Sequence, residues 1–167
     1  MCGRSGGRVG NEVRPVKEKE LADQLIARWH TNDPFELCSL LDILVVQVPL
    51  AAEIRGFCQY ALQTHIIYLN QSLEPRQARF VCAHELGHAL LHPHDNRIFL
   101  DTATYQVTAR LEVAANRFAC HLLYPEDSAF FECPDYTVEQ MAACLALPAE
   151  LVQYRIEHAA APFSAQP

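Results

Sequence analysis

Two histidines and a glutamate stand together at residues 84–88, which read His-Glu-Leu-Gly-His. In an H-E-x-x-H pattern on a helix, two imidazoles bind one zinc ion and the glutamate acts on a water molecule. Residues four apart on a helix lie one turn above each other, with Cβ atoms about 5–6 Å apart, so His84 and His88 can reach one cation. Glu85 projects from another side, toward the position of an attacking water. The pattern predicts a hydrolytic zinc site.

A catalytic zinc ion needs a third protein ligand and an open fourth position. His92 continues the four-residue spacing, but it lies roughly 12 Å along the helix axis from His84, too far to share one ion with it. His94 has the position of the third histidine in H-E-x-x-H-x-x-G-x-x-H, but Leu91 replaces the glycine that turns the chain in that pattern. Glu112, on a later predicted helix, is the third candidate, because its carboxylate would complete a set of two histidines and one glutamate around His84 and His88.

Other residues near these motifs are also candidates for a place in this site. Asn116 follows Glu112 by four residues and is well placed to bond the outer nitrogen of a zinc-bound histidine, although a surface position would also suit it. Tyr105 and His121 are candidate donors to an oxyanion, but packing roles fit them equally well. Cys82 precedes His84 by two residues and projects from a different side of the helix, so it is a poor ligand candidate.

The expected elements that position this site are helices, then short strands, then more helices. Helices are expected near 16–30, from Pro34 to Leu41, from about Pro75 to before Pro93, and near 107–123. Residues 43–48, 56–62 and 65–70 are β-branched or aromatic and too short for helices, so three strands form a small sheet.

Capping residues mark several of the helix ends. Asp33 precedes a proline, as an N-cap does. Thr137 and Gln140 have the spacing of a capping box at the first of two terminal helices, which Pro148 separates. This order predicts an α+β domain over 16–160, with a flexible tail at 1–15 and a frayed end at 161–167. The active-site helix should pack on the sheet among the other helices.

Composition limits the classes of function. The chain has 167 residues and a formal net charge of −7, which repels phosphate backbones and argues against direct nucleic-acid binding. The opening segment lacks the apolar stretch of a secretory signal, and no long apolar run could span a membrane. The seven cysteines are odd in number and contain no C-x-x-C pair, so we expect reduced thiols in a cytoplasmic protein.

Two motifs together resemble one known family. The segment FVCAHELGHALLH at 80–92, with EVAANRFA at 112–119 and LLYP at 122–125, is similar to the ImmA/IrrE metallo-endopeptidases. The resemblance implies a zincin-like fold, a single zinc ion and Glu112 as its third ligand. Proteins of this family commonly act on repressors with helix-turn-helix domains, so a repressor or antitoxin is the expected substrate. Tyr124 departs from the family, which more often has methionine there.

The resemblance and the motifs predict peptide-bond hydrolysis. A bound zinc ion lowers the pKa of water to about 7, and Glu85 would take the proton as that water attacks. The strand at 65–70 is expected to bind an extended peptide by edge pairing. One alternative is a regulatory binding module that keeps zinc but not proteolysis, which the intact Glu85 argues against. The other is DNA contact through the terminal helices, which the acidic charge disfavours.

Overall fold

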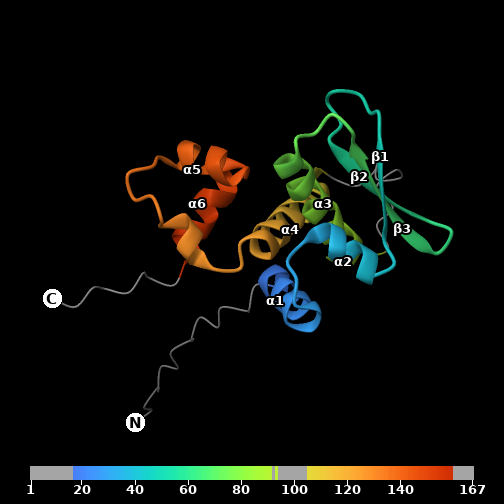
Figure 1. Ribbon diagram of the computed structural model, residues 1–167, viewed down its shortest axis with the longest axis horizontal. Coiled ribbons are helices and arrows are strands. Elements are labelled where there is room, and N and C mark those ends of the chain that lie inside the picture. The colour runs from blue at the N-terminus through green and yellow to red at the C-terminus, as the bar shows by residue number, and fades with distance from the viewer. Residues whose placement is uncertain (1–16, 92, 94–104, 160–167) are drawn as a thin grey trace, which may run out of the picture.

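The computed structural model describes residues 17–91, 93 and 105–159 (Figure 1). Its elements follow the predicted order of helices, strands and helices, which confirms the α+β class. They are α1 (Lys17–Trp29), α2 (Pro34–Leu40), β1 (Leu44–Val48), β2 (Gly56–Ala61), β3 (Thr64–Asn70), α3 (Pro75–Leu91), α4 (Tyr105–Leu123), η2 (Asp127–Phe130), α5 (Val138–Leu145) and α6 (Ala149–His158). The short 3₁₀ helix η2 was not predicted. None of the described helices is long and apolar enough to cross a membrane.

The three strands form one sheet in the order β1-β3-β2. Strand β3 pairs in parallel with β1, where Ile66 faces Leu44, and antiparallel with β2, where Tyr68 faces Phe57. The prediction that β3 offers an edge to an extended peptide is wrong, because partners occupy both of its edges. The outer strands are β1 and β2, and β2 is the one that begins beside the active-site helix.

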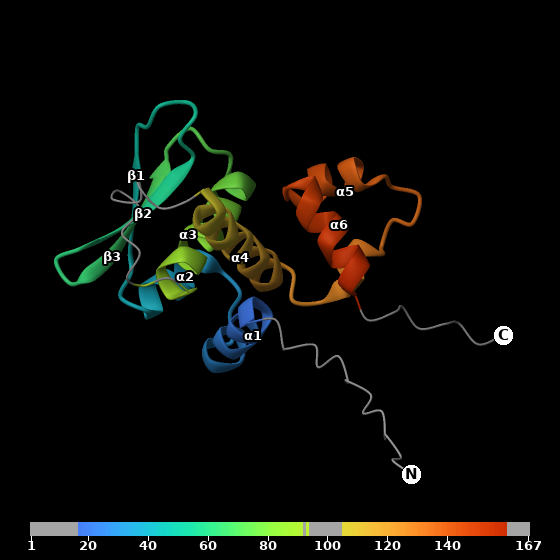
Figure 2. The ribbon, with the colours of Figure 1, turned by 180° about the vertical axis from the view of Figure 1, so that it is seen from behind.

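Helix α3 lies between the sheet and helix α4, with α2 also against it (Figures 1 and 2). A helix enclosed in this way is apolar on more than one side, and ten residues of α3 are buried. Leu86 of α3 and Phe118 of α4 are fully buried in the core, as is Ile67 of β3. Burying each such side chain contributes about 1.5–3 kcal/mol, so the core holds α3 firmly on both sides.

Both predicted caps are present. The Asp33 carboxylate accepts a hydrogen bond of 2.8 Å from the backbone N–H of Phe35 at the start of α2. At the start of α5, Thr137 Oγ1 accepts from the Gln140 N–H at 3.2 Å, and Gln140 Oε1 accepts from the Thr137 N–H at 2.9 Å. Each cap satisfies N–H groups that the helix itself leaves without a partner.

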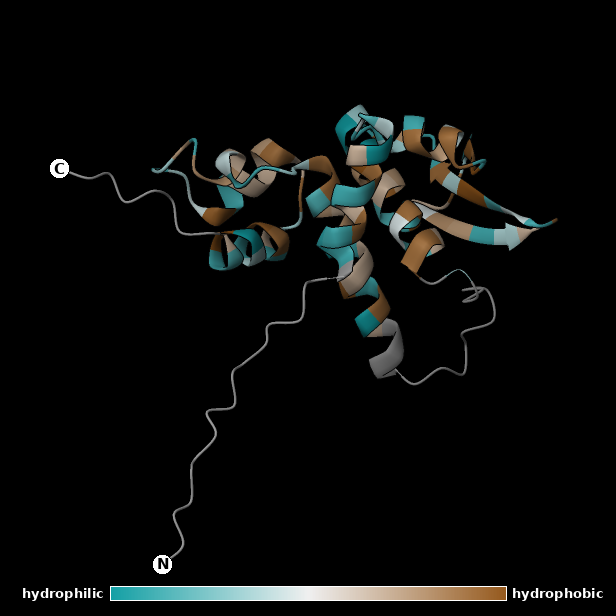
Figure 3. Cartoon of the chain, turned by 90° about the horizontal axis from the view of Figure 1, so that it is seen from below, coloured by the Kyte–Doolittle hydropathy of each residue, from teal (hydrophilic) through white to brown (hydrophobic). Residues whose placement is uncertain are grey.

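Helices α5 and α6 form a pair that lies beside α4, away from the sheet (Figure 1). Seen from below, both helices of the pair carry hydrophilic as well as hydrophobic residues (Figure 3). Two side chains bind the last carbonyls of α5: Tyr124 Oη donates to Leu145 O at 2.6 Å, and Arg76 Nη1 donates to Cys144 O at 3.0 Å. Tyr124 therefore connects the end of α4 to the end of α5.

An ion pair between a buried arginine and a partly exposed aspartate joins α6 to the segment after α4. Arg155 is 2% exposed, and its Nη2 and Nε donate to Asp127 Oδ1 at 2.5 and 3.1 Å. Its Nη1 donates to the carbonyl oxygens of Tyr124 at 2.7 Å and Cys120 at 3.4 Å. The guanidinium also lies over the Phe130 ring. One side chain thus ties together the end of α4, η2 and α6.

His121 is buried in the same region, with Nε2 3.5 Å from Tyr154 Oη. Burial, together with the positive charges of Arg155 and Lys19, lowers its pKa from 6.5 to about 4, although Asp23 and Asp127 oppose this. Between these values the unfolded chain binds a proton that the folded chain does not. Stability from neutral His121 is therefore fully present above pH 6.5 and is lost as the pH falls toward 4.

We expect the His121→Leu variant to have a flatter dependence of stability on pH. Between pH 7 and pH 4.5 the wild type should lose about 2 kcal/mol more of its free energy of unfolding than His121→Leu does, after a discount for solvent screening. Urea unfolding of metal-free protein at both pH values measures it. His30→Asn, an exposed substitution at the end of α1, is the control. Equal pH dependence in wild type and His121→Leu would contradict the prediction.

Candidate metal centre

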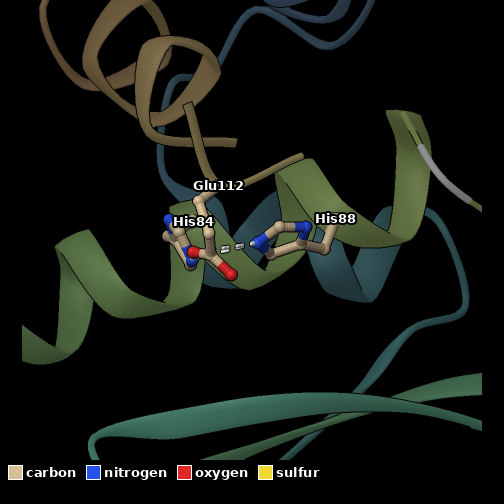
Figure 4. Close-up of side chains that lie close together, drawn as sticks. All are labelled: His84, His88 and Glu112. Atoms are coloured by element: carbon tan, nitrogen blue, oxygen red, sulfur yellow. Dashed lines mark hydrogen bonds and ion pairs between the residues drawn. The ribbon is translucent and has the colours of Figure 1, made fainter. Parts of the chain in front are cut away.

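His84 and His88 lie one turn apart on α3 and point toward Glu112, which comes from α4 (Figure 4). The distance between the two Nε2 atoms is 3.0 Å. Glu112 Oε2 lies 3.3 Å from His84 Nε2 and 3.8 Å from His88 Nε2. The structure therefore brings together all three residues that the sequence suggested as ligands.

The donor atoms fit a single metal ion in number, type and spacing. Each residue offers one ligand atom, and the three atoms lie within 4.8 Å of one another. Tetrahedral zinc with bonds of about 2.0–2.1 Å holds neighbouring ligand atoms roughly 3.3 Å apart. The observed separations of 3.0, 3.3 and 3.8 Å lie around this value. Two nitrogens and one carboxylate oxygen also match the donor set of a catalytic site with one open position.

Asn116 orients the first histidine. His84 Nδ1 lies 2.8 Å from Asn116 Oδ1, and an amide oxygen can only accept, so Nδ1 carries the proton. His84 Nε2 then keeps its lone pair, which is directed toward Glu112 and His88. This is the hydrogen bond predicted from the four-residue spacing of Glu112 and Asn116. It fixes the tautomer and the ring orientation that a metal requires.

Gly87 allows α3 and α4 to approach closely at the site. A Cβ atom at this position would lie 2.8 Å from Phe118 Cδ1 and 3.2 Å from Ala115 Cα. The second contact is with backbone, so a larger residue would push the helices apart. Glu112 lies less than one turn before Ala115 on α4, and its distance from the two histidines depends on this approach. The glycine in His-Glu-Leu-Gly-His thus positions the ligand from the other helix.

A cavity of about 440 Å³ opens beside two of the three residues, His84 and Glu112. His84, Glu85, Glu112 and Asn116 line one side of it, and the segment before β2 lines another. The Glu85 side chain is 3% exposed, although it lines the cavity. Gly56 begins β2 against α3, where a Cβ atom would lie 2.7 Å from Val81 Cγ1. Glu85 therefore borders the cavity while most of its side chain is shielded from solvent.

Two other candidates from the sequence, His121 and Cys82, do not lie at the metal centre. His121 lies against Tyr154 and does not line the cavity. Cys82 turns toward α2, where its Sγ is 3.9 Å from Cys38 Sγ. This contact and, after it, burial raise the pKa of the Cys82 thiol. His92, His94 and the Tyr105 side chain lie outside the described residues.

Sequence reasoning missed part of the cavity lining. Arg55, Phe80 and Pro148 all border the cavity, and they come from the segment before β2, from α3 and from the turn between α5 and α6. Phe80 could have been found, because it lies one turn before His84 on the same predicted helix. Arg55 and Pro148 carried no signal, since their approach depends on how distant segments pack.

An α+β fold that brings two histidines and a glutamate together beside a buried carboxylate has the donor set of a metal-dependent hydrolase. Comparison with known proteins agrees: the model of peptidase family M78, described as the IrrE N-terminal-like domain, matches residues 38–157. The chain therefore belongs to this metallopeptidase family, as the resemblance implied.

Two relatives illustrate the family. The chain is 36% identical over 138 residues to immunity region protein 2 of Bacillus phage phi105, and this match covers 82% of this chain and 87% of that protein. It is 27% identical over 143 residues to the metallopeptidase ImmA of Bacillus subtilis strain 168, and this match covers 83% of each of the two proteins.

Proposed function

We propose that this protein is a zinc-dependent endopeptidase in which His84, His88 and Glu112 hold one zinc ion and Glu85 is the catalytic general base. The observation that carries the proposal is the convergence of the three donor atoms beside Glu85 and the cavity. Zinc is favoured over manganese or iron because two imidazoles and one carboxylate suit its ligand preference and tetrahedral geometry.

A zinc ion bound here would act as a Lewis acid that polarises a peptide carbonyl and makes water more acidic. Glu85 accepts the proton of the attacking water and then delivers it to the amine nitrogen that leaves. Asn116 keeps the His84 ring in one orientation throughout, through the Nδ1–H bond.

The proposed substrate is a helix-turn-helix repressor or an antitoxin, cut at a specific site in the cytoplasm. A relative that is named as a phage immunity-region protein supports a regulatory protein as the substrate. The six cysteines within the described residues are all free, which suits a reducing compartment. A peptide could pair with β2, an outer strand of the sheet whose first residue lines the cavity.

Substitution of Glu112 tests the metal centre. We expect Glu112→Ala to weaken zinc binding by at least about tenfold, since even groups that only support a metal ligand contribute 10–100-fold. Competition with a chromogenic chelator measures the affinity. His94→Ala, which removes the other candidate for a third ligand, should leave the affinity unchanged. Weakening by His94→Ala but not by Glu112→Ala would overturn the proposed ligand set.

Cleavage of a co-expressed repressor tests the reaction. The zinc-loaded protein should cut it, and removal of the metal with a chelator should stop cleavage until zinc is restored. The competing idea of a regulatory binding module predicts that the repressor binds but remains whole. DNA contact through α5 and α6 has little support, because Arg155 is the single arginine or lysine of residues 138–158 and its side chain is buried against Asp127.

A further inference from the structure

A second cavity continues the first one toward helix α5. The two have volumes of about 440 and 470 Å³, and Arg55, Phe80 and Pro148 line both. Because three residues line both, the two cavities adjoin each other, and none of His84, His88 and Glu112 lines the second one. We term this second cavity, beside α5, the α5 groove. A peptide that lies across Glu85 has one flank that can enter it.

Small and apolar residues form the far wall of the α5 groove, namely Ala142, Ala143, Ala146 and Leu147. Alanine side chains leave space that a substrate side chain can occupy. The bonds from Tyr124 to Leu145 O and from Arg76 to Cys144 O hold this wall to α4 and α3. The groove is therefore a stable feature of the fold, with room for a side chain.

Arg55 is the one charged side chain that lines the α5 groove within the described residues, whereas Glu53, Glu85 and Glu112 line the first cavity. No other residue lining either cavity in the described part of the chain is an arginine or lysine. Its side chain is exposed and makes no hydrogen bond or ion pair with the described residues. A guanidinium presents a planar set of N–H donors that matches a carboxylate with two parallel hydrogen bonds. Arg55 is thus available to a carboxylate that enters from solution.

The backbone at Arg55 is fixed by Asn70, which is 5% exposed at the end of β3. Asn70 Nδ2 lies 3.3, 3.2 and 2.9 Å from the carbonyl oxygens of Leu50, Ala51 and Ile54. The Asn70 N–H donates to Arg55 O at 2.9 Å. The segment that carries Arg55 is therefore ordered before any ligand arrives, which lowers the entropy lost on binding.

We propose that Arg55 determines specificity by selecting an aspartate or glutamate side chain on one flank of the bond that is cut. This inference rests on the proposed peptidase function of the adjoining first cavity. Phe80 and the alanine wall accept the aliphatic part of that side chain, and Arg55 binds its carboxylate. The formal net charge of −7 repels acidic peptides in general, so a preference for acid at one position must come from a local cation.

A binding selection tests this proposal. Zinc-loaded Glu85→Gln protein, in which cleavage should be blocked, is immobilised and exposed to a random octapeptide library, and the bound peptides are sequenced. Aspartate and glutamate should be enriched about fivefold to tenfold at one position. The enrichment should vanish when Arg55→Gln is added, and Arg55→Glu should replace it with lysine and arginine. Arg28→Gln, which removes an exposed arginine on α1, should keep the acidic preference.

The outcomes separate this proposal from the peptidase proposal. Bound peptides without an acidic position, or an acidic preference that survives Arg55→Gln with Tm unchanged, would overturn the role of Arg55. Wild-type zinc-loaded protein is incubated with the same library in parallel, and its cleavage products are sequenced. If Arg55 selects acidic peptides but the wild type cuts none of them, the Arg55 assignment stands and the peptidase function fails.

Discussion

Glu85→Gln is expected to lower kcat for peptide hydrolysis by about 10²–10⁴-fold while the protein still binds zinc. Glutamine has nearly the shape of glutamate, so the buried position should tolerate it, but its amide cannot accept the proton of the attacking water. General acid and base groups contribute about this factor in enzymes. The measurement is the initial rate of cleavage of a co-expressed repressor by purified, zinc-loaded protein, together with the zinc content by atomic absorption.

Glu150→Gln is the matched control, since it makes the same change at an exposed position on α6. Its rate should equal that of the wild type. Cleavage by Glu85→Gln at more than about a tenth of the wild-type rate would be too fast for loss of a general base. Loss of zinc from Glu85→Gln would instead indicate that Glu85 contributes to the metal site itself.

The second large effect concerns the ion pair of Arg155 and Asp127. We expect Asp127→Ala to lower the free energy of unfolding by about 3–5 kcal/mol, because it leaves a buried guanidinium without its counterion. The double variant Asp127→Ala with Arg155→Met should be more stable than Asp127→Ala alone, since it removes the guanidinium that the first change leaves without a counterion. Urea unfolding of all the variants at pH 7 gives the comparison.

An exposed ion pair provides the control for this effect. Lys19 Nζ lies 2.7 Å from Asp23 Oδ2 on α1, and both side chains are 48% exposed. Asp23→Ala should cost less than about 1 kcal/mol, as exposed pairs do. An equal loss for Asp23→Ala and Asp127→Ala would show that burial of Arg155 adds nothing. A double variant less stable than Asp127→Ala would show that Arg155 stabilises through its bonds to Tyr124 O and Cys120 O.

Local sequence signals predicted most of the elements. The caps at Asp33 and Thr137 each involve residues two to three positions apart, so the sequence contains all the atoms that make them. The order of the strands in the sheet could not be read in this way. Pairing of β3 with β1 joins residues 22 positions apart, such as Leu44 and Ile66, and depends on packing against α3. For this reason the prediction that β3 has a free edge was wrong.

The same distinction holds for the site. His84, Glu85 and His88 share one helix, so their spacing predicts their arrangement. Glu112 and Asn116 were recognised because they repeat the helical spacing and resemble a known motif. Arg55 lies 29 residues before His84 in the sequence, and its place in the cavity depends on the hydrogen bonds of Asn70. No periodic pattern records such a contact.

The candidate metal ligands come from two helices, so a bound metal ion would connect α3 to α4 in the folded chain. A cation held by His88 and Glu112 would close a loop with 23 residues between them, as a disulfide does, but reversibly. Such a cross-link reduces the entropy of the unfolded ensemble, and a ligand bound only to the folded state raises Tm with its concentration. Availability of the metal could thus set the lifetime of this protein against proteolysis, quite apart from any turnover.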